Sequence, residues 1–156
     1  MSEVANIIEA KIEHYGRDRK ALIPILQGLV AEKNYVAKDD MVLIAKELDI
    51  SAADVYGTAS FFSFIEDEKK GKYVIRVCKS ITCDMKGRRG ILAALEKELR
   101  IKLGETTHDN LFTLHSVNCI GLCDVGPAML INDEPFTQLT TDKIHTIIRA
   151  KRNHKL

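Results

Sequence analysis

The hydrophobic positions of residues 4–70 recur with the spacing of amphipathic helices. The clearest run follows i, i+3, i+4, i+7 and i+8, the stripe that one face of a helix presents to a core. A weaker helix precedes this run, a third is capped by Asp39 or Asp40, and a fourth opens at Ser51 with a capping-box pattern. The sequence therefore predicts four helices at the N-terminus. The residues of the clearest run are Leu22, Ile25, Leu26, Leu29 and Val30.

Four aromatic residues fall in the fourth predicted helix: Tyr56, Phe61, Phe62 and Phe64. Aromatic side chains dominate the cores of small domains, so we expect this group to be buried. A face that docks a partner is the alternative interpretation.

A charged stretch from Glu66 to Lys72, interrupted by Gly71, ends the helical pattern. Residues 1–70 carry 9 basic and 13 acidic side chains, whereas residues 71–156 carry 14 basic and 9 acidic ones. We therefore expect two parts, a helical bundle subdomain over residues 1–70 and a second domain over residues 71–156.

Residues 71–156 alternate short β-rich runs with amphipathic helices. The predicted elements are a strand at 73–77, a helix from about Gly87 to Gly104, a strand at 111–117, a hairpin at 128–136 and a helix capped at Thr141–Asp142. This order is that of an α/β domain. The predicted fold class is therefore α/β, preceded by an all-helical N-terminal subdomain.

All four cysteines lie in the α/β part, in two pairs. Cys78 and Cys83 have four residues between them, and Cys119 and Cys123 have three. Each pair follows directly on a predicted strand, so neighbouring strands of one small sheet would bring both loops to the same edge. The sequence therefore predicts a four-thiolate site, which suits a zinc ion or an iron–sulfur cluster.

The spacing within the two pairs favours the iron–sulfur cluster. Structural zinc sites are typically built on tight knuckles with two residues between cysteines, whereas wider loops leave room for a larger group. The pattern also differs from plant-type, bacterial and Rieske centres, and it lacks the C-x-x-C of thioredoxin chemistry. A [2Fe–2S] cluster is favoured, with structural zinc or four unrelated buried cysteines as the alternatives.

Basic residues flank the first cysteine pair. A [2Fe–2S] cluster on four thiolates carries a formal charge of about −2 when oxidised and about −3 when reduced. Nearby cations favour the reduced form, so we expect Lys79, Lys86 and Arg88 to raise the reduction potential. Gly121 and Gly126 are expected to let the second loop pass close to the sulfurs, where its amides can donate hydrogen bonds.

Three segments carry a family resemblance: Val77–Gly87 (VCKSITCDMKG), Asn118–Ala128 (NCIGLCDVGPA) and Val55–Phe64 (VYGTASFFSF). The first two resemble the cluster loops of the thioredoxin-like [2Fe–2S] ferredoxin family. That family includes the small iron–sulfur subunit of respiratory NADH dehydrogenase (complex I), NAD-linked hydrogenases and formate dehydrogenases. The third resembles the family's helical-domain motif, usually nearer YGVATFYxxF. The resemblance covers nearly the whole chain, with departures at Asp84 and Asp124.

The resemblance implies a thioredoxin-like domain in which Cys78, Cys83, Cys119 and Cys123 bind one [2Fe–2S] cluster. It also implies a one-electron carrier subunit docked beside a flavin-bearing, NADH-oxidising subunit, with further iron–sulfur subunits in the same complex. Hydride brings two electrons and the cluster accepts one, so FMN and NAD(H) are expected on the partner subunit only. This chain has no nucleotide-binding fingerprint of its own. We therefore expect an electron-transfer subunit of an NAD(P)-dependent oxidoreductase that is not catalytic alone.

Residues 45–56 also resemble a DNA-binding helix-turn-helix, which would suggest an iron–sulfur or zinc-containing regulatory protein. Asp49 occupies the turn, where Gly is usual, and residues 38–56 contain two lysines against five acidic residues. DNA phosphates would repel that surface, and the net charge of the chain is only +1. We therefore expect no nucleic-acid partner.

The N-terminal residues show no signal or transit peptide, and no apolar run is long enough to span a bilayer. Four cysteines in 156 residues do not make a disulfide scaffold and suit a reducing compartment. We expect a protein of the cytoplasm, or of the cytoplasmic face of a membrane complex, without direct membrane insertion.

Overall fold

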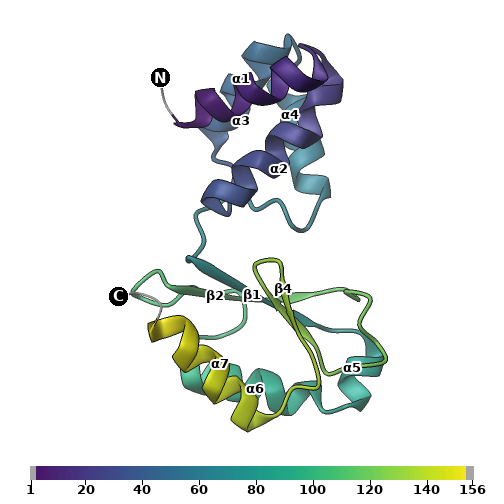
Figure 1. Ribbon diagram of the computed structural model, residues 1–156, viewed down its shortest axis with the longest axis vertical. Helices are drawn as coiled ribbons and strands as arrows, with labels where there is room; N and C mark the ends of the chain where they lie inside the picture. The colour runs from purple at the N-terminus through teal and green to yellow at the C-terminus, as the bar shows by residue number, and fades with distance from the viewer. Residues whose placement is uncertain (1–2, 154–156) are drawn as a thin grey trace. The chain divides into compact units, whose positions relative to one another are not determined.

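The computed structural model describes residues 3–153. The chain forms two compact units, and the boundary between them lies at Lys69–Lys70, within the charged stretch that ends the helical pattern (Figure 1). No helix within the described residues is long and apolar enough to cross a membrane.

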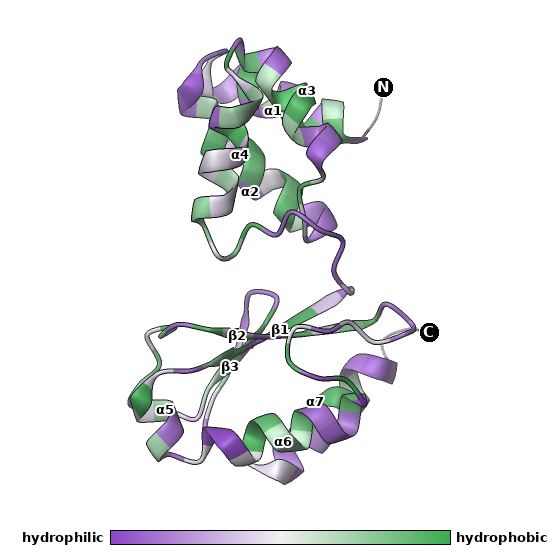
Figure 2. Ribbon diagram, turned by 180° about the vertical axis from the view of Figure 1, so that it is seen from behind, coloured by the Kyte–Doolittle hydropathy of each residue, from purple (hydrophilic) through white to green (hydrophobic). Residues whose placement is uncertain are grey.

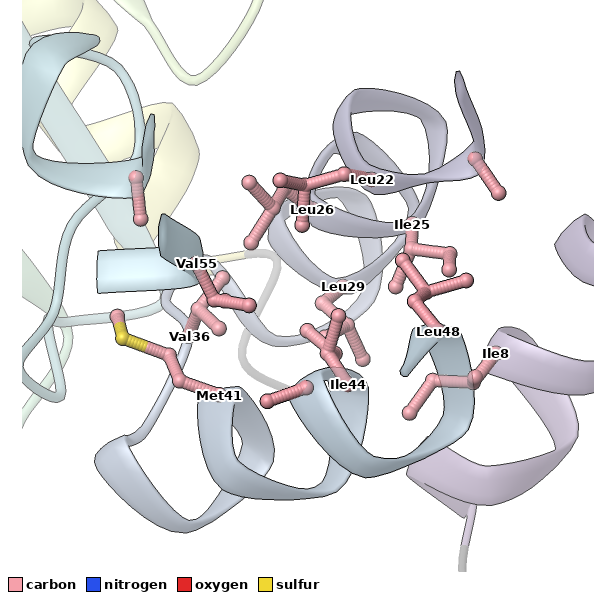
Figure 3. Close-up of a cluster of buried hydrophobic side chains, with 13 residues drawn as sticks. Ile8, Leu22, Ile25, Leu26, Leu29, Val36, Met41, Ile44, Leu48 and Val55 are labelled. Carbon is pink, nitrogen blue, oxygen red and sulfur yellow. The ribbon is translucent and has the colours of Figure 1, made fainter. Parts of the chain in front are cut away.

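The first unit is entirely helical, as its hydrophobic period predicts. Its elements are α1 (Glu3–Tyr15), a short 3-10 helix η1 (Arg19–Ala21), α2 (Leu22–Lys33), α3 (Lys38–Leu48) and α4 (Ala52–Phe61). The predicted stripe of α2 is confirmed, since four of its members are fully buried. They pack with side chains from the other helices in one core, which Figure 3 shows in close-up. Labelled members of this core are Ile8, Leu22, Ile25, Leu26, Leu29, Val36, Met41, Ile44, Leu48 and Val55.

The start of α3 differs from the prediction. Its N-cap residue is Ala37, and Asp40 lies inside the first turn. The Asp40 carboxylate accepts a hydrogen bond from the backbone N–H of Ala37 at 3.0 Å and pairs with Lys33 Nζ at 2.6 Å. A carboxylate in the first turn reaches back to the unpaired N–H groups there, so Asp40 stabilises the helix start from a different position. The cap of α4 is confirmed, because Ser51 Oγ accepts from the N–H of Asp54 at 3.1 Å.

The aromatic residues near α4 are not part of the core, so the prediction of burial was wrong. The helix ends at Phe61, and its buried face consists of the small residues Val55 and Ala59. Tyr56 and Phe61 lie on other faces of the helix and are 48% and 80% exposed. Phe62 and Phe64, which the sequence placed inside the helix, follow it and are also exposed.

The second unit is built on one four-stranded sheet with the order β2-β1-β3-β4. β1 and β2 are parallel, and β3 and β4 form a hairpin antiparallel to β1. α6 and α7 pack against each other and cover one face of the sheet (Figure 1). Figure 2 shows both hydrophobic and hydrophilic residues on these two helices, as expected for helices with one buried face. The bounds are β1 (Tyr73–Cys78), α5 (Ile81–Met85), α6 (Arg88–Leu99), β2 (Phe112–Val117), β3 (Met129–Ile131), β4 (Glu134–Phe136) and α7 (Thr141–Asn153).

The predicted α/β order is confirmed, with two local differences. The segment after β1, expected as a loop, contains the short helix α5, which is too brief to show a hydrophobic period. The next helix ends at Leu99, where Arg100 adopts the left-handed conformation with φ of 57°. Gly104, the predicted stop, lies in the following loop.

Candidate metal centre

The sheet register brings the two cysteine loops together. Cys78, the last residue of β1, lies opposite Val117, the last residue of β2, and the two strands are parallel. Lys79 N–H donates to the carbonyl of Val117 at 2.8 Å, so the first loop leaves the sheet beside the second. The second loop returns at Ala128, whose carbonyl accepts from Cys78 N–H at 3.2 Å. Both loops therefore lie at one edge of the sheet, as the sequence predicted.

The first cysteine pair is buried. Cys78 and Cys83 are 2% and 1% exposed. Ser80 lies between them, and its Oγ accepts from the Cys78 thiol at 3.3 Å and from Cys83 N–H at 3.5 Å. Burial raises the pKa of the Cys78 thiol, but hydrogen bonds with Ser80 and with the backbone of Ile120 outweigh it and lower that pKa. The thiolate form, which binds metals, is therefore favoured at Cys78.

The second cysteine pair is more open to solvent. Cys119 is exposed and Cys123 is partly exposed, and their Sγ atoms lie 3.2 Å apart. Gly121, with φ of 83°, directs its N–H at Cys119 Sγ at 3.4 Å, which confirms the expected amide contact to sulfur. The hydrogen bond with Cys119, then burial, and then the charges of Cys119, Cys78 and Cys83 raise the pKa of Cys123. The four thiols are thus within electrostatic reach of one another.

The two loops also approach each other directly. A Cβ atom at Gly126 would lie only 3.2 Å from Cys83 Sγ, so glycine permits the close approach that the sequence predicted there. Lys86 Nζ donates to the carbonyl oxygens of Cys123 at 3.1 Å and Asp124 at 2.7 Å. These contacts bring the second loop against the turn that carries Cys83.

The charges around the first loop are partly compensated. Asp84 accepts two hydrogen bonds from Arg89, at 3.2 and 3.1 Å, and lies 3.9 Å from a nitrogen of Arg88. Arg88 also donates to Ser116 Oγ at 3.0 Å, which ties the start of α6 to the end of β2. Because two arginines face Asp84, this departure from the family pattern adds no uncompensated negative charge beside the thiols.

Ser80 and Ser116 were missed by the sequence reasoning. Ser80 stands three residues before Cys83 and is the N-cap of α5, so the general preference of serine for N-cap positions was the available signal. Ser116 gave no such signal, because its bond to Arg88 joins segments 28 positions apart.

The donor set fits an iron–sulfur group. Four thiols in two pairs, one pair from each loop, are the ligands that a [2Fe–2S] cluster takes. Two sulfurs bound to one tetrahedral metal at about 2.3 Å lie about 3.7 Å apart, close to the 3.2 Å between Cys119 and Cys123. Within residues 3–153, no group of three or more His, Cys, Asp or Glu side chains is arranged around a single metal ion.

A small mixed sheet with two helices on one face, and four thiols gathered at one edge, defines a thioredoxin-like iron–sulfur protein. The chain belongs to the thioredoxin-like [2Fe-2S] ferredoxin family, whose model matches residues 8–152. The match extends over both structural units, and it confirms the resemblance seen in the cysteine loops.

Curated relatives agree with this assignment. One subunit of the NADH-quinone oxidoreductase of Escherichia coli (strain K12) is 40% identical over 141 residues, which cover 90% of this chain and 85% of the relative. The protein of the same name from Buchnera aphidicola subsp. Acyrthosiphon pisum (strain APS) is 36% identical over 149 residues, with coverage of 96% and 92%. These findings give no support to the DNA-binding alternative.

A solved structure confirms the fold. The chain aligns with a crystal structure of NAD+-reducing [NiFe]-hydrogenase in the air-oxidized state, with a TM-score of 0.77 and 21% sequence identity. The alignment covers 88% of this chain and 24% of that chain. The chain therefore spans about a quarter of the hydrogenase chain, and this likeness concerns the fold.

Proposed function

We propose that this chain is a one-electron carrier subunit of an NADH-linked oxidoreductase complex of the NADH-quinone oxidoreductase type. Cys78, Cys83, Cys119 and Cys123 would hold one [2Fe–2S] cluster, which accepts and releases one electron at a time. The observation that carries the proposal is the convergence of four thiols from two loops at one sheet edge, in a chain of the [2Fe-2S] ferredoxin family.

The residues around the thiols have three roles in this proposal. Burial of Cys78 and Cys83 limits access of water to one side of the centre. Backbone N–H groups such as that of Gly121 donate to sulfur, which stabilises negative charge there. Lys79, Lys86 and Arg88 place positive charge on the same edge, and they would favour the reduced, more negative state.

The proposal assigns NADH oxidation to a partner subunit. Hydride carries two electrons, so a flavin must separate them before a one-electron centre receives them. We place FMN and NAD(H) on the partner, because this sequence contains no G-x-G-x-x-G fingerprint of a dinucleotide-binding unit. The curated relatives are named as subunits, which supports assembly into a larger complex.

An exposed apolar patch on the helical unit also supports assembly. It consists of Ile23 on α2, Tyr56 and Phe61 on α4, and the adjoining Phe62, each at least 40% exposed. An open groove runs between Ile23 and the Phe61–Phe62 corner. Groups of exposed apolar side chains mark interaction surfaces in many proteins, and aromatic residues are enriched at interface cores. We assign this patch to contact with another subunit of the same complex.

We propose the cytoplasm, or the cytoplasmic face of a membrane complex, as the site of action. All four cysteines are free thiols, and the Cys119 and Cys123 sulfurs are close enough to be vulnerable to oxidation. A reducing compartment keeps such thiols available for metal binding. Residues 1–70 and 71–156 remain our proposed functional division, with the cluster in the second part.

Metal and sulfide analysis of the anaerobically purified chain tests the cluster. We expect two irons and two sulfides per chain and an EPR signal after reduction. Cys→Ser at any of the four positions should abolish or reshape that signal. Met85→Ser is the matched control, because Met85 is an 83% exposed sulfur residue in the same loop and should leave the signal unchanged. Zinc in place of iron, or four Cys→Ser variants with unaltered iron and EPR, would refute the assignment.

Affinity purification from the native host tests the complex. We expect a flavin-containing, NADH-oxidising protein to copurify, and Phe61→Ser to reduce its recovery without loss of cluster. Val42→Ser, on an exposed position of α3, is the control. NADH oxidation by the isolated, flavin-free chain would contradict the carrier role.

A further inference from the structure

The side chain of Lys86 connects the two cysteine loops through backbone oxygens. Its Nζ donates to the carbonyls of Cys123 at 3.1 Å and Asp124 at 2.7 Å. Lys86 itself is fixed at the end of α5, because its N–H donates to the carbonyl of Thr82 at 3.2 Å. One side chain therefore links the turn that carries Cys83 to the main chain of Cys123.

Gly126 lies against this link. A Cβ atom there would lie 3.2 Å from Cys83 Sγ and 3.5 Å from Cδ of Lys86. The aliphatic part of Lys86 thus passes beside Gly126, while the ammonium group reaches the preceding residues of the same loop. Contact between the loops is made by the lysine stem as well as by its charge.

We propose that Lys86 is a positioning residue, which holds the second cysteine loop against the first and slows the loss of the metal centre. The sequence pattern treated Lys86 only as one of several cations near the thiols. The structure distinguishes it, because its ammonium group makes two hydrogen bonds to the loop that carries Cys119 and Cys123. Hydrogen bonds from a charged donor are stronger than neutral ones. The effect on metal retention rests on the proposed function, whereas the effect on the loop does not.

Lys79 is a matched control for the charge of Lys86. It has the same side chain, is exposed, and is adjacent to Cys78. Its ammonium group makes no hydrogen bond or ion pair with the part of the chain that the structure describes, residues 3–153. Lys79→Met therefore removes one positive charge beside the thiols and leaves the loop contact in place. Lys86→Met removes both, and Lys86→Arg keeps the charge and a donor.

The first measurement is hydrogen exchange of the full chain without metal. Two amides report on the second loop: Gly121, which donates to Cys119 Sγ, and Gln138, which donates to the carbonyl of Val125 at 2.7 Å. We expect Lys86→Met to accelerate their exchange about tenfold, from the loss of hydrogen bonds to a charged donor at an exposed site. Lys79→Met should stay within twofold of the unsubstituted chain, and Lys86→Arg within about threefold.

The second measurement is release of iron to a chelator from the loaded chain, together with its EPR spectrum and reduction potential. Lys86→Met should release iron about tenfold faster than Lys79→Met and alter the EPR line shape, and Lys86→Arg should restore both. Both Met variants should lower the potential, because each removes a cation. Circular dichroism verifies folding, and Lys86→Gln replaces Lys86→Met under the same limits if the latter does not fold.

Equal exchange and equal iron release in Lys86→Met and Lys79→Met would overturn the proposal, since Lys86 would then act by charge alone. Failure of Lys86→Arg to rescue would also overturn it. A chain that binds no iron, but in which Lys86→Met still accelerates loop exchange, would refute the proposed function and retain the positioning role of Lys86.

Discussion

Gly71→Ala provides a sharp test of how the cluster domain is held together. Gly71 is buried just before β1, and its N–H donates to Thr113 Oγ1 at 2.7 Å. A Cβ at this position would lie 2.9 Å from three backbone atoms of Leu111 and Phe112, where β2 begins. Optimal carbon contacts are about 3.5–4.0 Å, so the added methyl group would overlap these atoms by about 0.6 Å or more. Backbone atoms cannot rotate away as a side chain does, so the two strands must separate locally.

The size of the effect follows from two contributions. Overpacking costs about 1–3 kcal/mol. Displacement from Thr113 sacrifices a hydrogen bond that contributes about 0.5–1.5 kcal/mol. We therefore expect Gly71→Ala to lower the free energy of unfolding by about 2–4 kcal/mol, which corresponds to roughly 4–16 °C in Tm for a chain of this size.

Urea unfolding followed by circular dichroism, with hydrogen exchange of the β1 amides, measures this effect. Gly90→Ala is the control. Gly90 lies within α6, a Cβ there meets no atom within 4 Å, and alanine favours the helix. It should leave stability unchanged or raise it by about 0.5–1 kcal/mol. A Gly71→Ala chain as stable as Gly90→Ala would refute the reasoning from close backbone contact.

Three further predictions concern the other parts of the chain. Leu26→Ala, at a fully buried core position, should destabilise the helical unit by about 2–5 kcal/mol in urea unfolding, whereas Val42→Ala at an exposed position should change it little, and equal effects would contradict the assigned core. Gly126→Ala should crowd Cys83 Sγ and reduce iron and sulfide content, unless the measured content and EPR signal match the unsubstituted chain, which would show that the loops are free to separate. Hydrogen bonds from Arg19 and Ser51 lower the pKa of Asp54, so its stabilising effect is present above its unfolded pKa near 3.9 and is lost as the pH falls through the lower folded value. The difference in Tm between the unsubstituted chain and Asp54→Asn should therefore shrink from pH 6 to pH 3, and a difference that is constant with pH would refute this contribution.

The position of the thiols has a simple structural basis. A parallel pair of strands sends its two carboxyl ends to the same edge of the sheet, and here each of those ends leads into a cysteine pair. The connection between the strands contains α5, whose N-cap Ser80 also accepts from the Cys78 thiol. The turn that starts the helix and the site that gathers the sulfurs are therefore built by the same residues.

Most elements of the fold were determined by local sequence features. The periods of the apolar residues, helical before residue 70 and largely strand-like after it, identified the helices and strands and the α/β class. The cysteine pairs at the ends of predicted strands indicated a four-thiol site without any knowledge of tertiary contacts. These features are local, because a period of 3.6 or 2 and a spacing between cysteines can be read within one segment.

Only the tertiary structure decided which residues touch across segments. Phe61 has the composition of a core residue, yet it is exposed, because the buried face of α4 is filled by Val55 and Ala59. Lys86 has the charge of a neighbour to a metal centre, yet it holds Cys123 and Asp124 through carbonyl groups 37 and 38 positions away. Which face of a helix turns inward, and which backbone oxygens a long side chain reaches, depend on the packing of distant segments. Local period and residue type do not encode that packing separately.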